Sequence, residues 1–460
     1  MATRDLTTCR PASGLIRFAI PLILGNMFQQ LYNLVDTVVV GNYCGPGALA
    51  AVGASNPVLQ LFTCISVGGG IGASVIIGQM YGARQFRRMM TAIKTAVITF
   101  FVIGAVLMTV GIVFHRPILA FMRTPDNVLD DSALYMRIYF YGFLFTMMFN
   151  IFNAVFNAMG DSKKPLLFLA VSSVLNIFLN IYFITRLGMT VDGVAWATVI
   201  SQGIAVILTL IVLIRKLKKF AAGNDTPGGC HAGTAKAGGS MWFDAHLMKT
   251  IFKVAGPSII QQSIVALGLL AIQSVINGFG DIAMAGYVAA NKIDLMAILP
   301  MSNMGNAVST FTAQNIGAKK IERIPQGLKA GLMAVVVSGL CIAAILFIFG
   351  SPLVGLFVKG EGAAEVIAEG ARYLKISSGF YFVFGAMNSF CGVLRGAGDM
   401  KGFLVAYLIN FGGRVGLVFA LAAGVGLYMV AWCTVISWAL ALVYAAIWYK
   451  TGRWKTLSLI

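Results

Sequence analysis

Two carboxylates stand where carboxylates are rare. The chain has 16 acidic residues, and only Asp36 and Asp294 fall well inside long apolar runs. An ionisable side chain inside a membrane is costly and is functional by default. Burial disfavours the charged form of a carboxyl group, so Asp36 is predicted to carry a proton or to act as one ligand of a Na⁺ site. The alternative is a structural carboxylate capped by neighbouring hydroxyl and amide groups.

A second set of buried charges lies further along the chain. Lys292 and Asp294 open one apolar run, and Arg414 lies within another. An unpaired arginine in hydrocarbon costs at least a few kcal/mol. We therefore predict that Arg414 faces the interior of its helical bundle and pairs with Asp294. A structural ion pair and a coupling role are both open interpretations of this pair.

Polar and aromatic side chains near Asp36 could line a substrate cleft. Gln29 lies about two helical turns before Asp36 and so shares its face. The run at 134–158 carries Tyr139, Asn153 and Asn157 among many aromatic residues and methionines. Such side chains accept varied amphiphiles and contact cations through their π faces. The alternative is that the aromatic residues contact only lipid or the protein core.

The composition places these residues in a membrane protein. Of 460 residues, 58% are hydrophobic and 11% charged, with a mean hydropathy of +0.85. A soluble protein has about 25% charged residues, so a soluble enzyme, a disordered chain and a disulfide-stapled domain are excluded. We predict an all-α polytopic protein with twelve transmembrane helices. The expected spans are at about 18–40, 52–80, 92–114, 134–158, 165–186, 192–214, 250–276, 284–312, 328–349, 372–394, 402–424 and 426–449.

The net charge of +18 is interpreted as an orientation signal. With the N-terminus inside, most Lys and Arg residues fall on inner segments, so both termini are expected to be cytoplasmic. Because these charges are loop anchors rather than one basic face, no nucleic-acid partner is expected. The 7 cysteines and 3 histidines show no metal-type spacing. We therefore expect neither a metal site nor a cofactor.

The two halves of the sequence repeat. Pro21 recurs as Pro257, and Val194-Ala195-Trp196 recurs as Val430-Ala431-Trp432 at the same separation. A Gly-rich polar stretch separates the halves, which gives an N-lobe at 1–215, a cytoplasmic linker at 216–248 and a C-lobe at 249–460. Since each repeat has an even number of spans, the two six-helix lobes are expected to be related by a pseudo-two-fold axis along the membrane normal. Such lobes enclose a central cleft and favour transport by alternating access.

Proline at equivalent places in both repeats suggests moving parts. Pro21 and Pro257 fall in the first span of each half, where proline removes a helix hydrogen bond and kinks the helix. These prolines are candidate kink or gate positions. Static bending to fit the lobe is an equal alternative.

The layout resembles the multidrug and toxic compound extrusion (MATE) transporters of the bacterial type. The resemblance covers nearly the whole chain. It rests on Pro21…Gln29…Asp36-Thr-Val-Val-Val-Gly41, Gln79-Met-Tyr-Gly82-Ala83, Gly193-Val-Ala-Trp196-Ala-Thr198, Gln314-Asn-Ile-Gly317-Ala318 and Arg395-Gly-Ala-Gly-Asp399. Membership implies export of organic cations or other amphiphiles, coupled to inward flow of H⁺ or Na⁺.

The resemblance also implies a cation site in the N-lobe. In the family this site combines the first-span Asp with an Asn and an Asp one turn apart on the fifth span and a Thr on the sixth. The matching positions here are Asp36, Asn176, Asn180 and Thr198. Asn180 departs from the pattern, because many members carry a second acid there. A single carboxylate compensates Na⁺ less well than two, which favours H⁺ modestly and leaves Na⁺ open.

We therefore predict a secondary antiporter of the bacterial cytoplasmic membrane. Its expected partners are small amphiphilic or cationic organic compounds and the lipid bilayer, and the chain is expected to be a monomer. The alternative is a flippase for lipid-linked oligosaccharides, which has a related architecture but needs several basic groups in its cavity. A membrane-embedded enzyme is disfavoured because no acids or histidines cluster at one membrane face.

Overall fold

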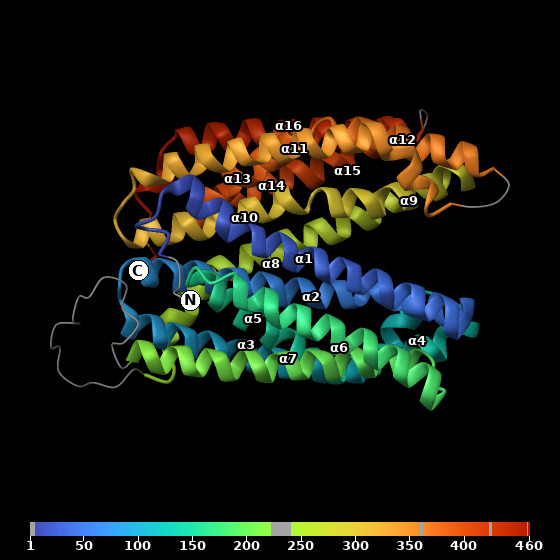
Figure 1. Ribbon diagram of the computed structural model, residues 1–460, viewed down its shortest axis with the longest axis horizontal. Coiled ribbons are helices and arrows are strands. Elements are labelled where there is room, and N and C mark those ends of the chain that lie inside the picture. The colour runs from blue at the N-terminus through green and yellow to red at the C-terminus, as the bar shows by residue number, and fades with distance from the viewer. Residues whose placement is uncertain (1–4, 222–240, 359–361, 423–425, 458) are drawn as a thin grey trace. The chain divides into compact units, whose positions relative to one another are not determined.

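The computed structural model of the chain describes residues 5–221, 241–358, 362–422, 426–457 and 459–460. These residues form helices joined by short connections, with no strand in the described ranges. The first half contains α1 (Pro11–Val39), α2 (Gly45–Gly82), α3 (Phe86–Phe121), α4 (Asp126–Tyr141), α5 (Phe143–Ala158), α6 (Lys163–Leu187) and α7 (Val191–Ala221). Figure 1 shows these helices in blue to green.

The second half contains more, shorter helices. They are α8 (Ala245–Ile276), α9 (Asp281–Ala297), α10 (Leu299–Gly317), α11 (Arg323–Gly355), α12 (Ala363–Ser378), α13 (Tyr381–Ala397), α14 (Met400–Tyr407), α15 (Gly413–Leu417) and α16 (Leu427–Lys450). A wider π-helical turn at Leu408–Gly412 joins α14 to α15, and a second one at Val418–Ala422 follows α15. Together they make one apolar helical run, Met400–Leu421. Most of the expected linker at 216–248, namely residues 222–240, lies outside the described residues.

The number of apolar helices agrees with the predicted spans. Nine runs in the described chain are long and apolar enough to cross a membrane, and two bent helix pairs bring the total to 11. The first run, Pro11–Gly82, has 72 residues. At 1.5 Å per residue it is about 110 Å long, enough for two crossings of a hydrocarbon core of about 30 Å. The described helices therefore account for twelve crossings.

The sequence repeat is also a structural repeat. The helix pairs α4–α5 and α12–α13 are each bent by 47° at a short break. Arg84 and Lys319 follow α2 and α10 at equivalent positions, and both have φ of 57°. In each case the next residue donates its amide to a carbonyl five residues back, Gln85 to Met80 at 3.0 Å and Lys320 to Asn315 at 2.9 Å. The two motifs thus end their helices with the same left-handed turn, a common way to satisfy the last carbonyls of a helix.

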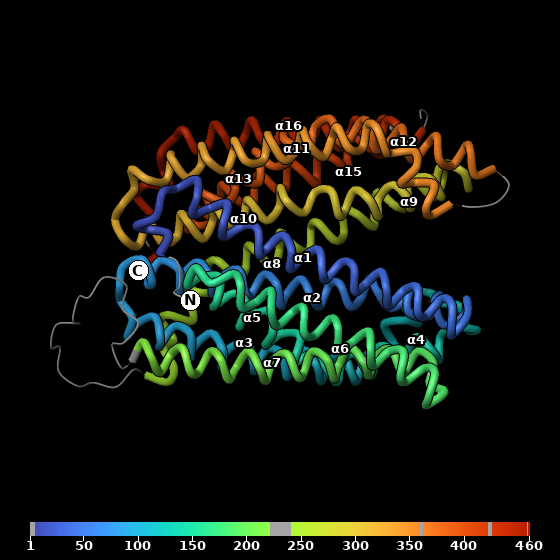
Figure 2. Tube along the Cα trace, in the orientation of Figure 1, coloured from blue at the N-terminus to red at the C-terminus, as the bar shows by residue number. Residues whose placement is uncertain are grey.

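Two compact units divide the chain in an unexpected place. One unit is Met1–Asp5 with Leu24–Ile259, and the other is Leu6–Ile23 with Ile260–Ile460. Of the three boundaries, the one after Asp5 precedes α1, whereas those after Ile23 and Ile259 fall inside the continuous helices α1 and α8, whose Cα traces Figure 2 draws. Each crossover comes two residues after the helix proline, Pro21 or Pro257. The lobes at 1–215 and 249–460 remain a prediction. The two units differ from these lobes because the first part of α1 belongs to the second unit and the first part of α8 to the first unit. We call these two segments the exchanged half-helices.

Glycine lets the second half of α2 pack closely on the first half of α8. A methyl group placed on Gly68 would meet the backbone of Ile259 at 2.6 Å, and one on Gly72 would meet that of Ala255 at 2.6 Å. Small residues of this kind bring helix backbones together in membranes, where packing replaces the hydrophobic effect between helices. This contact lies within the first unit and helps to hold the start of α8 there.

One segment assigned to the linker is helical. α7 continues to Ala221, and Lys216 within it is only 6% exposed. Its ammonium group donates to Asp161 at 2.8 Å and lies 5.2 Å from the centre of the Phe156 ring. The apolar stem of lysine packs readily against such a surface, and the carboxylate compensates the charge. Placing Lys216 in a flexible linker was therefore wrong.

Candidate functional site

The first unit brings the four expected cation-site residues together. Asp36 on α1 accepts a hydrogen bond from the side-chain amide of Asn180 on α6. The same amide donates to the side-chain carbonyl oxygen of Asn176 at 3.1 Å. Asn176 in turn donates to the Thr198 hydroxyl on α7 at 3.2 Å. The four side chains therefore form one continuous chain of hydrogen bonds across three helices.

The helical spacing explains how α6 supplies two members of this chain. Asn176 and Asn180 are one turn apart, so their side chains lie on one face of the helix. Both are almost fully buried, with exposed fractions of 1% and 0%. Thr198 sits on the adjacent helix α7 and donates its hydroxyl hydrogen back to the Val194 carbonyl at 3.1 Å. Its oxygen is thereby fixed as the acceptor for Asn176.

One oxygen in this cluster lacks a partner. The side-chain carbonyl oxygen of Asn180 is buried and accepts no hydrogen bond from any described residue. A buried acceptor without a partner is unfavourable unless a ligand, a water molecule or a mobile proton satisfies it. The Asp36 carboxylate, the two Asn oxygens and the Thr198 hydroxyl are all hard oxygen donors, the type that small hard cations prefer. The cluster can therefore offer an acceptor either to a protonated Asp36 or to a bound cation.

Three tyrosines lie around the Asp36 carboxylate. Tyr32, Tyr135 and Tyr139 are each close enough to interact electrostatically with Asp36, and Tyr32 also lies beside Thr198. Of these, only Tyr139 was predicted from the sequence. Tyr32 could have been found from its position one turn before Asp36, which places both on the same helix face. Tyr135 is one turn before Tyr139 on α4 and could have been found in the same way.

The expected cleft residues occupy different environments. Gln29 is exposed on α1, whereas Asn153 and Asn157 are partly buried on α5. The side-chain carbonyl oxygens of Asn153 and Asn157 are buried and accept no hydrogen bond from described residues. Because these asparagines are one turn apart, both oxygens belong to one face of α5. This face can accept hydrogen bonds from a ligand or from water.

Asp294 in the second unit is held by a tyrosine. It is 8% exposed and accepts a hydrogen bond from the Tyr381 hydroxyl on α13. Arg414 is 7% exposed and close enough to interact electrostatically with Asp294. No ion pair within 4.0 Å joins the two among the described residues, and the Arg414 Nε has no hydrogen-bond partner there. The two charges thus share a buried region without the direct ion pair that we predicted.

Arg395 is buried rather than exposed as a loop anchor. It is 8% exposed at the end of α13 and bonds to Asn306 and Ser309 of α10. The basic residues of the inner segments were expected to be loop anchors, and the burial of Arg395 at a helix end departs from that expectation. Lys292, by contrast, is exposed, and its ammonium group lies 5.5 Å from the centre of the Phe357 ring.

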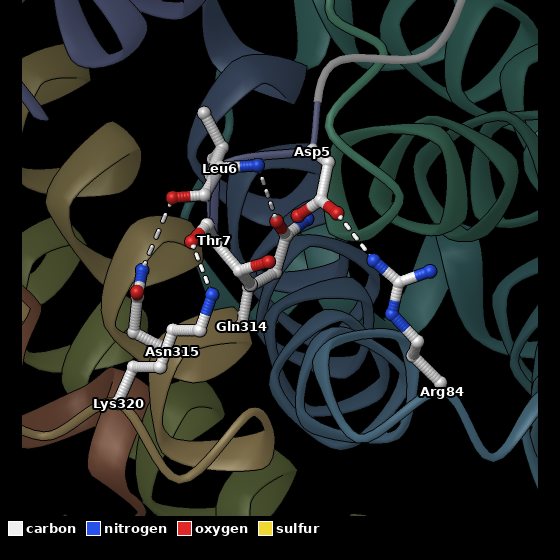
Figure 3. A network of polar contacts seen from close by, with 7 residues as sticks. All are labelled: Asp5, Leu6, Thr7, Arg84, Gln314, Asn315 and Lys320. Atoms are coloured by element: carbon white, nitrogen blue, oxygen red, sulfur yellow. Dashed lines mark hydrogen bonds and ion pairs between the residues drawn. The ribbon is translucent and has the colours of Figure 1, made fainter. Parts of the chain in front are cut away.

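The segment before α1 is bound to the second repeat. The Leu6 amide donates to the Gln314 side chain at 3.2 Å, and the Leu6 carbonyl accepts from Asn315 at 3.3 Å. Lys320 donates to the Thr7 carbonyl at 3.0 Å. Figure 3 shows these contacts, together with the ion pair between Asp5 and Arg84 at 3.1 Å. The Gln314-Asn315 motif therefore acts as a docking point for the N-terminal segment.

The repeated helical bundles and the buried polar chain define a polytopic membrane transporter. The family model described as MatE matches residues 21–182 and 257–422. The chain therefore belongs to the MATE family of transporters.

Similar proteins and solved structures agree with this assignment. The chain is 31% identical over 389 residues to the probable multidrug resistance protein YoeA of Bacillus subtilis, covering 83% of this chain and 81% of that protein. It is 29% identical to the probable multidrug resistance protein YpnP of the same organism, covering 100% of this chain and 99% of that protein. A MOP superfamily transporter from Pyrococcus furiosus has the same fold, with a TM-score of 0.86, 22% identity and 98% of both chains covered.

Proposed function

We propose that this protein is an antiporter that exports small amphiphilic or cationic organic compounds in exchange for H⁺ or Na⁺, with Asp36 as the coupling carboxylate. The observation that carries the proposal is the hydrogen-bonded chain from Asp36 through Asn180 and Asn176 to Thr198. A carboxylate held inside a membrane helix by neutral amides can bind and release a proton or a cation without moving. The names of relatives, which are multidrug resistance and multidrug export proteins, support multidrug export as the direction of transport.

The neutral side chain at Asn180 favours a proton over Na⁺ as the coupling ion. Asp36 is the single carboxylate in the cluster, and one negative charge is enough to take up one proton. When Asp36 is protonated, its new O–H needs an acceptor, and the unpartnered Asn180 oxygen lies on the adjacent side chain. Na⁺ has the same four oxygen-bearing side chains available but only one formal charge to balance its own.

We further propose that the chain lies in the bacterial plasma membrane as a monomer, with both termini in the cytoplasm. The orientation of the termini follows from the asymmetry of Lys and Arg between alternate loops. In this arrangement the proton released by Asp36 to the cytoplasm leaves a carboxylate free to attract a cationic compound. Asn153, Asn157, Tyr139 and Gln29 are then the side chains best suited to contact the compound.

The test is efflux of a fluorescent cationic dye from proteoliposomes. A pH gradient and a Na⁺ gradient are imposed separately on the wild-type protein, on Asp36→Asn and on Asp131→Asn. Asp131 is an exposed acid on α4 and serves as the matched control for loss of one negative charge. We expect a pH gradient to drive efflux by the wild type and Asp131→Asn but not by Asp36→Asn.

Two outcomes would contradict the proposal. Gradient-driven efflux by a correctly inserted Asp36→Asn protein would remove Asp36 from coupling. Failure of both gradients to drive efflux by the wild type would argue against antiport itself. A flippase would instead move a lipid-linked pyrophosphate, so binding of such a lipid in place of the dye would favour that alternative.

A further inference from the structure

The second unit contains a small cavity around a buried arginine. Residues of α10, α13 and α14 line it, and its volume of about 10 Å³ leaves room for one water-sized atom. Arg395 supplies the positive charge in this cavity. The other lining residues are Ser302, Gly305, Asn306, Asn388, Cys391, Gly392, Phe403 and Tyr407.

Glycines create this cavity by bringing α10 and α13 into backbone contact. A methyl group on Gly392 would meet the Gly305 carbonyl oxygen at 2.4 Å, and one on Gly396 would meet the Ser309 carbonyl oxygen at 2.3 Å. Such close packing is a property of small residues spaced one turn apart. It brings the Arg395 side chain against α10, and Gly305 and Gly392 line the cavity beside it.

The Arg395 guanidinium uses part of its hydrogen-bonding capacity on the protein. Its Nε donates to the Ser309 hydroxyl at 3.1 Å, and one Nη donates to the Asn306 side-chain oxygen at 2.8 Å. The Phe403 ring centre lies 5.6 Å from the guanidinium carbon. A guanidinium group has five N–H donors, so the remaining donors are available to a ligand.

No described carboxylate neutralises this charge. Arg395 forms no ion pair within the described ranges. The acid nearest in sequence, Asp399, is engaged elsewhere: one oxygen accepts from the Gly402 amide at 3.1 Å and the other from the Trp448 indole at 2.8 Å. The neutral side chains of Asn306 and Ser309 orient the guanidinium group without compensating its positive charge. A buried, uncompensated charge is costly and is stabilised by a counter-ion.

The cavity opens toward a polar face. Asn306 is exposed, while Ser302 and Thr310, one turn away on either side along α10, are partly exposed. Surfaces that face lipid are apolar because the hydrocarbon offers no hydrogen bonds. This stripe of hydroxyl and amide groups therefore faces water, which indicates that a ligand enters from solution.

We propose that this cavity binds the oxyanion group, a carboxylate or a phosphate, of a water-soluble solute. One oxygen of the group occupies the cavity and accepts from the free N–H donors of Arg395, while the rest of the group stays at the mouth beside Asn306 and Ser302. Planar guanidinium groups match oxyanions in both charge and shape. The site lies entirely in the second unit and does not depend on the proposed role of Asp36.

The test measures binding of small anions to the purified full-length protein in phosphatidylcholine nanodiscs. Equilibrium dialysis with labelled inorganic phosphate and labelled acetate, at constant ionic strength, gives the dissociation constants. We expect saturable binding of one equivalent to the wild type. Arg395→Gln should weaken binding about tenfold or more, since a hydrogen bond to a charged group is lost together with the charge.

Matched variants separate a specific site from a general charge effect. Lys401→Gln removes the same charge from an exposed residue nearby and should leave binding unchanged. Asn306→Ala changes an exposed residue at the mouth, so it tests the site even if Arg395→Gln fails to fold, and it should weaken binding several-fold. Equal binding by wild type and Arg395→Gln, equal losses in Lys401→Gln and Arg395→Gln, or no saturable binding to the wild type would each overturn the proposal. Loss of the anion binding when anionic lipids replace phosphatidylcholine would assign the site to a lipid headgroup and would overturn it too.

Discussion

At the scale of single residues, the proposed coupling role of Asp36 depends on its neighbour Asn180. Its amide nitrogen donates to both Asp36 and Asn176, and its own oxygen has no partner among the described residues. This arrangement holds the carboxylate in place while keeping one acceptor available. A change at Asn180 should therefore alter the choice of coupling ion more than the fold.

Asn180→Asp should shift coupling from H⁺ toward Na⁺. A second carboxylate supplies the charge that a single Asp lacks, so the Na⁺ concentration for half-maximal transport should fall about tenfold, equivalent to about 1.4 kcal/mol. The measurement is dye efflux from proteoliposomes at graded Na⁺ concentrations without a pH gradient. Asn180→Leu, which keeps the side-chain size but offers no oxygen, is the control. An Asn180→Asp protein with unchanged ion dependence would contradict this role for Asn180.

Lys216 provides a second prediction at this scale. Lys216→Met removes the buried partner of Asp161, whose second partner, Lys164, lies further away at 3.6 Å. Because Lys164 still offers partial compensation, the expected loss of stability is about 1–3 kcal/mol. Thermal unfolding in detergent measures it. The double variant Asp161→Asn with Lys216→Met should recover part of the loss, and a double variant less stable than Lys216→Met would contradict the pairing argument.

At the scale of helices, α1 and α8 are the elements that change units. Each passes from one unit to the other two residues after its proline. Proline leaves one backbone carbonyl of the preceding turn without its hydrogen bond and so weakens the helix there. A weak point beside a boundary between two units is suited to bending when the units move.

Pro21→Ala should make transport slower and the protein more stable. Alanine restores the missing helix hydrogen bond, so bending at this point becomes more costly, and the melting temperature should rise by a few degrees. Initial rates of dye efflux should fall several-fold. Pro352→Ala in α11, a helix that stays within one unit, is the control. An undiminished efflux rate in Pro21→Ala would show that the proline only shapes the helix.

The elements were largely predictable from the sequence, whereas the contacts between them were not. Runs of apolar residues specify membrane helices because lipid demands internal hydrogen bonding. The family resemblance also located Asp36, Asn176, Asn180 and Thr198, which the structure brings into contact. The spacing of apolar residues along a helix does not tell which faces of distant helices pack together. The burial of Arg395 and the lack of an ion pair between Asp294 and Arg414 therefore became visible only in the packed structure. Lys216 was misplaced because a basic residue beside a polar stretch resembles a linker.

At the scale of the whole molecule, the N-terminal segment ties the start of α1 to the second repeat. Leu6 and Thr7 are held by Gln314, Asn315 and Lys320, and the Cys9 carbonyl accepts from Arg323. Both charged donors bind backbone carbonyls, so these contacts do not depend on the side chains of the segment. The first turns of α1 should therefore follow the second unit.

Removing both charged donors should free this segment. In Lys320→Ala with Arg323→Ala, hydrogen–deuterium exchange at Leu6–Ile16 should become about tenfold faster, because two hydrogen bonds to charged groups are lost. Exchange in the centre of α2 should not change. Lys329→Ala removes an exposed charge from α11 and is the control. Unchanged exchange at Leu6–Ile16 would mean that other contacts suffice to hold the segment.

The exchanged half-helices bear on how such a chain could arise. Each repeat begins its first helix in the unit formed mostly by the other repeat, and the switch falls at equivalent positions, Ile23–Leu24 and Ile259–Ile260. A shorter ancestor with one repeat could complete neither unit alone. Two copies would have had to exchange the N-terminal halves of their first helices, as in domain-swapped dimers. Gene fusion of the two copies would then have kept both exchanged half-helices in one chain.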